Sequence, residues 1–308
     1  MIRKKNGKGL LLLLITGALL MTGSTGCSKQ AADTKQKVEG LDKLGQIGVI
    51  SREEGSGTRG TFAQLAGFVQ ENTDKDQTVK DAKIADDTAS VLNMVGSDRS
   101  AIGYGSAGIM VSDSQVKVLS VGGVEPGKNN AGYPLSRSFY LVWSGKLNDV
   151  EDDFMRYIRG AGQEIVSQSY TAVGKQSSFL SLKPKGKITV TGSTSVGPLL
   201  ECLAEEYMKL NPKAVITVKQ TDSSDGIRQT MQGKCDLGMS SRDLKDNEKE
   251  ILDYESIARD EIAVIVNKEN PLEDISLEQL EKIYTGKIKE WQKLYEVKSE
   301  GGHYREAD

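Results

Sequence analysis

Three segments of this sequence share one order: a short apolar run, a loop rich in glycine, serine and threonine, and then apolar residues at helical spacing. In the first, the apolar run at 47–50 leads into the loop Arg-Glu-Glu-Gly-Ser-Gly-Thr-Arg at 52–59. The apolar residues behind this loop recur with the period of one helix face: Phe62, Leu65, Ala66 and Val69. Strands that feed helices through short loops are typical of an α/β fold.

The second and third segments repeat this order. The loop at 191–198 follows a strand-like run and precedes an apolar stripe at helical spacing that comprises Leu199, Leu200, Leu203, Tyr207 and Leu210. This helix is predicted to end at Asn211-Pro212, because proline cannot continue a helix. The third loop, 221–226, also lies between a strand-like run and a helical segment.

Loops of this kind can hold an oxyanion. Gly55 and Gly57 let the backbone come close to a ligand, and Ser56 and Thr58 offer hydroxyl groups. The helix N-terminus behind them leaves N–H groups without internal partners, which favours an anion. The alternative is that Ser56 or Thr58 only caps the helix. Because the same kind of loop occurs three times, we favour the anion site.

Residues 1–26 are predicted to be a signal peptide. Basic residues precede an apolar run at 10–20, and small residues lead to Cys27. The apolar run is shorter than the roughly 20 residues that a membrane-spanning helix needs. The segment resembles a bacterial lipoprotein signal with Cys27 lipidated, although Ser24 stands where such signals usually have leucine. The alternative is an ordinary cleaved signal peptide. Residues 27–44 are then a lipidated N-terminus and a polar, flexible tether.

Composition narrows the classes of partner. The formal net charge of the 308 residues is −3, which gives no basic patch and argues against nucleic acid. An anion must therefore be bound by local dipoles and a small number of cations. The chain beyond the tether is large for a single core and typical of two lobes.

Cysteine and histidine are too scarce for several kinds of active site. Apart from Cys27, the chain has Cys202, Cys235 and the single His303. We therefore expect no zinc-type cluster and no Ser-His-Asp or Cys-His arrangement. Cys202 and Cys235 are expected to be buried small residues, and a disulfide between them stays open.

Between the first and second loops the sequence predicts helices at 88–95 and 150–170 and strands at 101–104, 116–119 and 139–143. Beyond the third loop it predicts a strand and polar turn at 236–242, an apolar strand at 262–266 and a helix at 275–283. The segment at 298–308 has no period and is expected to be a loose tail.

Several motifs together resemble the phosphate-binding protein family of high-affinity phosphate ABC importers. Residues 188–291 resemble the first half of that family through Gly-Ser-Thr-Ser-Val, Ser-Ser-Asp-Gly-Ile, Asp-Leu-Gly-Met-Ser-Ser-Arg, Ile-Ala-Val-Ile-Val-Asn and Ile-Tyr-Thr-Gly-Lys-Ile. Residues 47–180 resemble its second half through Arg-Glu-Glu-Gly-Ser-Gly-Thr-Arg, Ala-Ile-Gly-Tyr and Tyr-Pro-Leu-Ser-Arg. The two halves stand in the reverse of the family's usual order.

The resemblance implies a circularly permuted, two-lobed periplasmic-binding-protein-like fold of type II, with the ligand in the cleft between the lobes. One lobe would comprise 45–134 plus 264–297 and carry the Gly-Ser-Gly-Thr loop. The other would comprise 135–263 and carry the Gly-Ser-Thr-Ser and Ser-Ser-Asp-Gly loops. Such permutation is tolerated where loops are exposed and termini lie close together. The alternative is a fragment of a tandem array that must pair with another chain.

The resemblance also implies the residues that contact phosphate: Arg52, Ser56, Gly57 and Thr58 from one lobe, and Thr194, Ser195, Ser224 and Ser241 from the other. An arginine fork matches phosphate oxygens, and neutral hydroxyl and N–H donors replace water without adding unpaired charge. For Arg52 the alternative is a surface ion pair with Glu53 or Glu54. Whether Ser223 or Ser224 faces the ligand stays open, and Arg59 and Arg242 fit structural ion pairs as well as ligand contacts.

Position 241 departs from part of the family. Some members have an aspartate where this chain has Ser241. A carboxylate there accepts a hydrogen bond from protonated phosphate and repels fully ionised sulfate, whereas serine accepts without repelling. Discrimination against sulfate or arsenate is therefore not expected from this position, although Asp225 or Asp236 could supply a carboxylate.

The resemblance implies an extracytoplasmic receptor, anchored to a bacterial cell membrane through Cys27, that closes its lobes on inorganic phosphate and delivers it to the permease subunits of an ABC importer. We expect a monomer without a cofactor, without nucleic-acid partners and without enzyme activity. The alternatives are a binding protein for another oxyanion, a phosphate sensor, or a phosphoester hydrolase. For a phosphoester hydrolase, the sequence offers no evident base beside a nucleophile and no evident metal cluster.

Overall fold

The fold is described from a computed structural model, which covers residues 38–70, 75–110, 115–127, 130 and 132–296. The predicted signal peptide, the lipidation residue Cys27 and the tail at 298–308 lie outside these residues. In the covered ranges, no helix is long and apolar enough to cross a membrane. The helices described there are α1 (Gly57–Leu65), α2 (Thr88–Gly96), α3 (Ala107–Met110), α4 (Asp149–Arg159), α5 (Gln163–Ser169), α6 (Gly197–Leu210), α7 (Ser223–Met231), α8 (Asp246–Lys249) and α9 (Leu277–Tyr284), with the 3-10 helices η1 (Leu41–Lys43) and η2 (Trp291–Tyr295).

One hydrogen-bonded sheet connects all the described strands. Its main path runs in the order β2 (Lys83–Ala85), β1 (Gly48–Arg52), β3 (Ala101–Ser106), β9 (Asp253–Asn267), β5 (Ser136–Trp143), β8 (Leu237–Ser240), β6 (Gly186–Ser193) and β7 (Ala214–Thr221). Off this path, β4 (Val116–Val121) pairs with β9 and with β10 (Asp274–Ile275). The strands at both ends of the path pair in parallel, whereas β9 is antiparallel to each of its neighbours.

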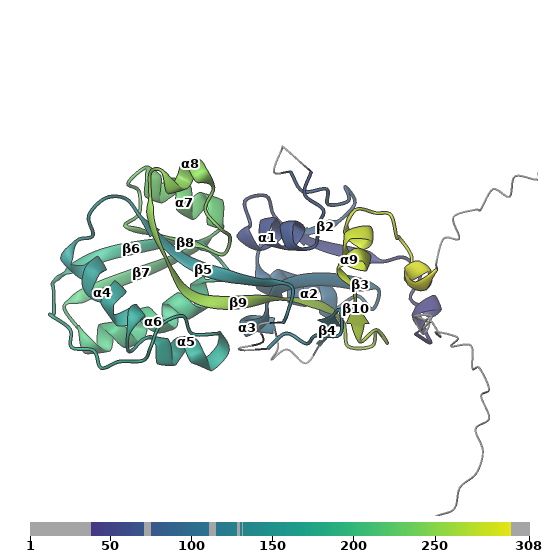
Figure 1. The fold of residues 1–308 in the computed structure, drawn as a ribbon, viewed down its shortest axis with the longest axis horizontal. Helices are drawn as coiled ribbons and strands as arrows, with labels where there is room; N and C mark the ends of the chain where they lie inside the picture. Colours follow the sequence, from purple (N-terminus) through teal and green to yellow (C-terminus); the bar gives the residue numbers. More distant parts are fainter. Residues whose placement is uncertain (1–37, 71–74, 111–114, 128–129, 131, 297–308) are drawn as a thin grey trace, which may run out of the picture. The chain divides into compact units, whose positions relative to one another are not determined.

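The long strands β5 and β9 join two groups of elements. The first part of β9, Asp253–Glu261, pairs with β5, and the part from Ile262 onward pairs with β3 and β4. Figure 1 shows the two strands running side by side from the group with β6, β7 and β8 to the group with β1, β3 and α9.

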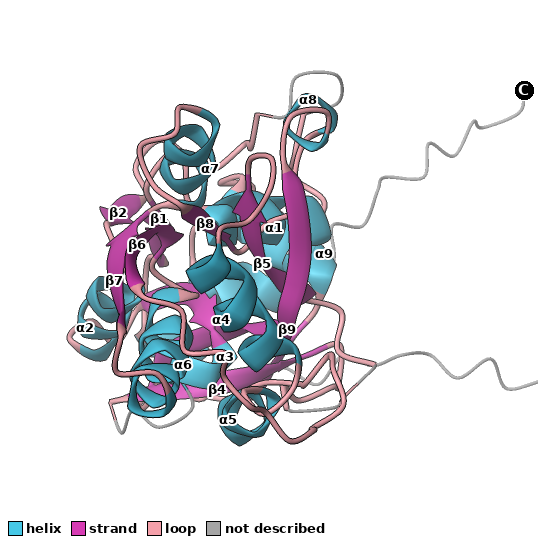
Figure 2. Cartoon of the chain, turned by 90° about the vertical axis from the view of Figure 1, so that its left-hand side faces the viewer, coloured by secondary structure: helices cyan, strands magenta, loops and turns pink. Residues whose placement is uncertain are grey.

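Two main apolar cores lie on either side of this junction. One contains only residues between Phe139 and Ala258, and we call the part of the chain around it the central half. The other contains residues from Leu41 to Leu135 and from Ile262 to Leu294, and we call the part around it the terminal half. In Figure 2, which looks onto the end with β6 and β7, helices α4, α6 and α7 surround the strands of the central half.

Both ends of the described chain contribute to the terminal half. The backbone N–H of Ile47 donates to Lys289 O at 2.8 Å, and that of Trp291 donates to Gly45 O at 3.0 Å. The indole Nε1 of the fully buried Trp291 donates to Ser100 O at 2.8 Å. Segments more than 190 positions apart in sequence thus pack as one unit.

Most predicted elements are confirmed, and the exceptions have a local cause. The helix predicted at 150–170 is two helices, α4 and α5, separated at Gly160–Gly162. A Cβ at Gly162 would lie 2.9 Å from Leu203 Cδ2, so the chain turns where α6 passes close by. The helix predicted at 275–283 begins later, at Leu277, because Ser276 caps it and Ile275 pairs in β10.

Candidate anion-binding site

The three loops lie at the carboxyl ends of parallel strands. β1 ends at Arg52, β6 at Ser193 and β7 at Thr221, and each leads through its loop into a helix. Ligands of α/β folds bind at this edge, where helix N-termini and loop side chains gather. At the N-terminus of α6, beside Thr194 and Ser195, no side chain of the described residues caps the helix. The N–H groups of its first turn therefore remain suited to an anion.

The first loop belongs to the terminal half, the other two belong to the central half, and hydrogen bonds join them. Thr58 Oγ1 and Ser195 Oγ are 2.9 Å apart, and both side chains are buried. Arg52 Nη2 donates to Thr194 Oγ1 at 3.0 Å. The backbone N–H of Ser224 donates to Gly55 O at 3.2 Å. The residues predicted from separate motifs therefore meet at one place.

Arg52 is held by the next residue of the chain, Glu53. Its Nε and Nη2 donate to the carboxylate of Glu53 at 2.7 and 2.8 Å, and only 1% of Arg52 is exposed. Burial raises the pKa of Glu53, and the adjacent Arg52 opposes that rise. The ion pair with Glu53 that the sequence offered as an alternative is present, but Arg52 is buried in it, and its Nη2 donates to Thr194 of the opposite half as well as to Glu53.

Gly57 lies against two hydroxyl groups of the central half. A Cβ at this position would lie 2.4 Å from Ser223 Oγ and 2.8 Å from Ser241 Oγ. Ser241 Oγ in turn accepts from Ser193 Oγ at 2.9 Å. Glycine is therefore required for the close approach of the two halves, not for a special backbone angle.

The two candidate serines of the third loop have different surroundings. Ser223 is fully buried, and its Oγ accepts from the backbone N–H of Ser241 at 3.0 Å. Ser224 Oγ accepts from Arg242 Nη2 at 3.4 Å. The geometry thus places the hydroxyl of Ser223 among the site hydroxyls and that of Ser224 beside Arg242.

Ser56 caps α1, as the alternative interpretation of the loop proposed. Its Oγ accepts from the N–H of Arg59 at 3.4 Å. Thr58 has no such role, because its hydroxyl faces Ser195. The capping alternative thus applies to Ser56 and not to Thr58. Ser56 is also buried, with 6% of its surface exposed.

Charged residues near the loops are engaged in structural contacts. Arg59 pairs with Asp76 at 2.8 Å, and Arg242 pairs with Glu248 at 2.8 Å. Asp236 accepts from the N–H of Thr189 at 2.6 Å. Asp225 binds the side chains of Arg228 and Gln229. Asp225 and Asp236 were the candidates to supply the carboxylate that position 241 lacks. Among the described residues, both contact other groups and not the hydroxyls of the site.

Arg137 is a residue that sequence reasoning missed. It projects from β5, is buried, and donates from Nη1 to Thr58 Oγ1 at 2.7 Å. Its Nε and Nη2 donate to Asp260 Oδ2 at 3.1 and 2.9 Å. The signal was available: Arg137 ends the Tyr-Pro-Leu-Ser-Arg motif and shares the inward face of its strand with Phe139.

The cysteine prediction is partly wrong. Cys235 is buried, as expected, but Cys202 is exposed because it lies outside the buried stripe of α6, and both are free thiols. Leu210, predicted in that stripe, is also exposed. In the described part of the chain, no group of three or more histidine, cysteine or acidic residues is arranged to hold a metal ion.

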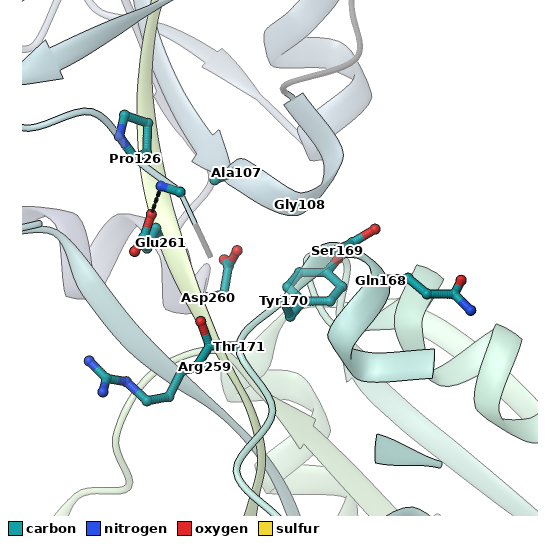
Figure 3. A pocket seen from close by; sticks show the side chains of 11 residues that line it. Ala107, Gly108, Pro126, Gln168, Ser169, Tyr170, Thr171, Arg259, Asp260 and Glu261 are labelled. Atoms are coloured by element: carbon teal, nitrogen blue, oxygen red, sulfur yellow. Dashed lines mark hydrogen bonds between the residues drawn. The ribbon is translucent and has the colours of Figure 1, made fainter. Parts of the chain in front are cut away.

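A cavity of about 500 Å³ is lined in part by Asp260, the ion-pair partner of Arg137. Figure 3 shows Asp260 at this cavity with Tyr170, Thr171 and Glu261. The described residues that line it include none from the three hydroxyl-bearing loops. The converging hydroxyl groups, not this cavity, therefore define the candidate site.

Comparisons with known proteins agree with this architecture. A family model described as a PBP superfamily domain matches residues 171–303. The "Phosphate-binding protein PstS 2" of Streptococcus pneumoniae serotype 4 is 38% identical over 280 residues, which are 88% of this chain and 94% of the relative. The protein of the same name from Streptococcus agalactiae serotype V is 36% identical over 304 residues, 94% of this chain and 99% of the relative.

Among solved structures, a phosphate-binding protein of a phosphate ABC transporter from Streptococcus pneumoniae superposes with a TM-score of 0.67 at 38% identity. The match covers 81% of this chain and 100% of that chain. By contrast, the "Phosphate-binding protein PstS" of Bacillus subtilis aligns over only 139 residues, 44% of each chain, at 35% identity.

Proposed function

The chain belongs to the PstS family of phosphate-binding proteins, and we propose that it binds inorganic phosphate between its two halves and delivers it to an ABC importer. The observation that carries this proposal is the contact of Arg52, from the terminal half, with Thr194 of the central half at 3.0 Å. A guanidinium and a set of hydroxyls from both halves supply several donors to a tetrahedral anion.

The proposed mechanism is closure around the ligand. An anion that accepts hydrogen bonds from both halves binds the closed arrangement more tightly than an open one, so it shifts the population toward closure. The strand pair of β5 and β9, with the segment that leads into β5, provides the connection around which such a motion would occur.

The proposed phosphate contacts are Arg52, Ser56, Gly57, Thr58, Thr194, Ser195 and Ser241, with the hydroxyl of Ser223 in place of that of Ser224. The burial of Thr58 and Ser195 and their mutual hydrogen bond support this set. The position of Ser224 Oγ beside Arg242 favours Ser223 as the hydroxyl donor.

We also propose that the chain is circularly permuted, with lobes of 45–134 plus 264–297 and of 135–263. The distribution of the two apolar cores supports this division, with the exception that Leu135 and Ile262 pack in the core of the terminal half. An alignment preserves residue order, so a relative with its halves in the opposite order aligns over one half only. The partial match to the Bacillus subtilis protein, beside nearly full-length matches to the streptococcal proteins, fits this expectation.

The contacts between the segments around Ile47 and Trp291 support a terminal half that is built from one chain, over a fragment of a tandem array that pairs with another chain. We further propose that the protein is extracytoplasmic and anchored through lipidated Cys27. Mass spectrometry of the membrane fraction from bacterial cells tests this: a diacylated N-terminal Cys27 is expected, and an unmodified residue released with the medium would contradict it.

Binding without catalysis is favoured by the state of the nearby carboxylates. Glu53 is paired with Arg52, and Asp260 is paired with Arg137. Each carboxylate accepts hydrogen bonds from a guanidinium, and in the described part of the chain neither one contacts a hydroxyl group of the three loops that it could deprotonate as a general base. We therefore propose a receptor and not a phosphoester hydrolase.

Calorimetric titration of the phosphate-free chain from Ser28 onward tests the proposed function. We expect one phosphate per chain, and a loss of about 10- to 100-fold in affinity for Arg52→Lys, which keeps the charge but loses the fork. Arg159→Lys is the matched control, because Arg159 forms a partly exposed ion pair with Glu255. A folded wild-type chain that binds no phosphate would overturn the proposal.

A further inference from the structure

The proposed function leaves one buried cation without a role. Arg137 is 6% exposed, and all three of its polar nitrogens have partners: Nε and Nη2 with Asp260, and Nη1 with Thr58. Ser106 Oγ donates to the other carboxylate oxygen of Asp260 at 3.0 Å. Asp260 therefore fixes the guanidinium from behind, and Nη1 is directed at a hydroxyl of the candidate site.

The two guanidinium groups form similar units that contact different hydroxyls of the site. Arg52 has Glu53 behind it and Thr194 in front, and Arg137 has Asp260 behind it and Thr58 in front. Thr58 is itself bonded to Ser195, beside Thr194. In both units the guanidinium donates to a carboxylate and to a hydroxyl group of the site.

The two cations are close enough to affect each other. Burial lowers the pKa of Arg137, Asp260 opposes this, and the charge of Arg52 lowers it further. Two like charges in a buried site repel each other more strongly than in water. An anion accepted between them would relieve this repulsion.

We infer that Arg137 is a second cation of the anion site, positioned by Asp260, and that the site therefore selects doubly charged tetrahedral oxyanions, sulfate as well as hydrogen phosphate, over singly charged phosphate. This inference rests on the proposed function and specifies the ligand of the same site.

The hydrogen-bonding groups around the site support selection by charge. A singly charged phosphate has two O–H groups that need acceptors, and a carboxylate is the acceptor that distinguishes them from bare oxygens. The carboxylates that contact the two arginines are engaged, Glu53 with Arg52 and Asp260 with Arg137, and Oδ1 of Asp222 accepts from the N–H of Asp225 at 2.8 Å. Ser241, a neutral group, faces the other hydroxyls.

Other titratable groups border the two arginines. Tyr104 and Tyr170 have their pKa raised by burial, Tyr104 to about 12, so both are neutral near pH 7. Asp87, at the start of α2, has its pKa lowered, first by the N–H of Ser90 and to a lesser degree by Arg52. Burial raises the pKa of Glu53, so the test includes a ligand whose own charge is constant.

Calorimetric titration with phosphate and with sulfate at pH 6 and pH 8 tests the inference on the chain from Ser28 onward. Phosphate affinity is expected to rise about tenfold between these values, because the apparent affinity follows the dianionic fraction of the ligand. Sulfate keeps its charge over this range, so its affinity is expected to stay constant, and it should compete with phosphate for one site. The sulfate titration thereby reports any contribution of Glu53 or other protein groups.

Variants separate a ligand contact from a structural role. Arg137→Gln alone would leave the buried Asp260 unpaired and could prevent folding. The double variant Arg137→Gln/Asp260→Asn removes both charges of the pair and keeps polar groups of similar shape. We expect it to fold, to lose about 10- to 100-fold in affinity for sulfate and for phosphate at pH 8, and to show a smaller pH dependence for phosphate. Arg159→Gln/Glu255→Gln, which removes an ion pair of the same half, is the matched control.

The outcomes distinguish the inference from the proposed function. If the wild-type chain binds neither anion at either pH, the proposed function fails. If it binds phosphate but not sulfate, the proposed function stands and the inference fails. The same holds if it binds phosphate with equal affinity at both pH values. Unchanged affinity and pH dependence in a folded double variant would likewise overturn the role of Arg137.

Discussion

At the scale of single residues, the site depends on side chains that are small or held in place. Gly57 allows α1 to approach Ser223 and Ser241, and Glu53 and Asp260 each orient an arginine toward a hydroxyl group. The hydroxyls themselves contact one another, as in the pair Thr58 and Ser195. Each donor is therefore placed by contacts that do not involve the ligand, which lowers the entropic cost of binding.

Gly57→Ala is expected to weaken phosphate binding at least about tenfold while changing the free energy of unfolding of the ligand-free protein little. The added Cβ would lie 2.4 Å from Ser223 Oγ and would keep the two halves from closing fully. Titration calorimetry with denaturant unfolding measures both quantities. Gly60→Ala, in the same helix with no atom within 4 Å of its Cβ, is the control and should bind normally. Equal affinity in Gly57→Ala and wild type would contradict the close approach.

At the scale of elements, the strand-to-helix connections carry the site, and interruptions elsewhere let the helices pack. The segment after β5 illustrates this, since α4 and α5 are separated at Gly160–Gly162 although their apolar residues suggest one continuous helix. Asn148 and Glu151 form a capping box that fixes the start of α4. The sequence pattern describes each helix face well, but contact with α6 decides where the turn occurs.

The sign of the effect of Gly162→Ala tests this explanation. If residues 150–170 formed one helix, alanine would stabilise it by about 1 kcal/mol. In the structure the new Cβ would lie 2.9 Å from Leu203 Cδ2 and 3.0 Å from Ile158 Cα, so we expect destabilisation of about 1–3 kcal/mol from overpacking. Equilibrium urea unfolding followed by circular dichroism gives the difference. Stabilisation by alanine would show that the steric explanation is wrong.

At the scale of the whole molecule, the central and terminal halves have separate cores and share the strands β5 and β9. Hydrogen bonds between loop side chains, such as Arg52 with Thr194, add contacts across the site. Two packed bodies joined by a pair of strands are suited to closure around a ligand, because each body can move without disturbing its own core.

Phosphate at a hundred times its dissociation constant is expected to add about 2.7 kcal/mol to the free energy of unfolding, because the ligand binds the folded form. If the anion bridges the halves, the whole thermal transition should move to higher temperature, and Arg52→Ala should lose most of this shift. Differential scanning calorimetry with and without phosphate measures it. Two transitions of which only one responds to phosphate would contradict binding by both halves.

The amino-acid sequence by itself determined the local chemistry of this protein: the strand, loop and helix order, the hydroxyls at 56, 58, 194 and 195, and Arg52 beside Glu53. These features are readable because turn residues and apolar periodicity act over a few neighbouring positions. The resemblance of its motifs also led to the family that the comparisons show.

Only the tertiary structure decided which of these residues meet. It placed Ser223 instead of Ser224 among the hydroxyls, exposed Cys202, divided the helix at Gly160–Gly162, and brought Arg137 and Asp260 behind Thr58. Arg137 and Thr58 are 79 positions apart, and Arg137 and Asp260 are 123 positions apart. Contacts over such separations depend on how strands align and halves pack, and no local pattern in a single sequence encodes them.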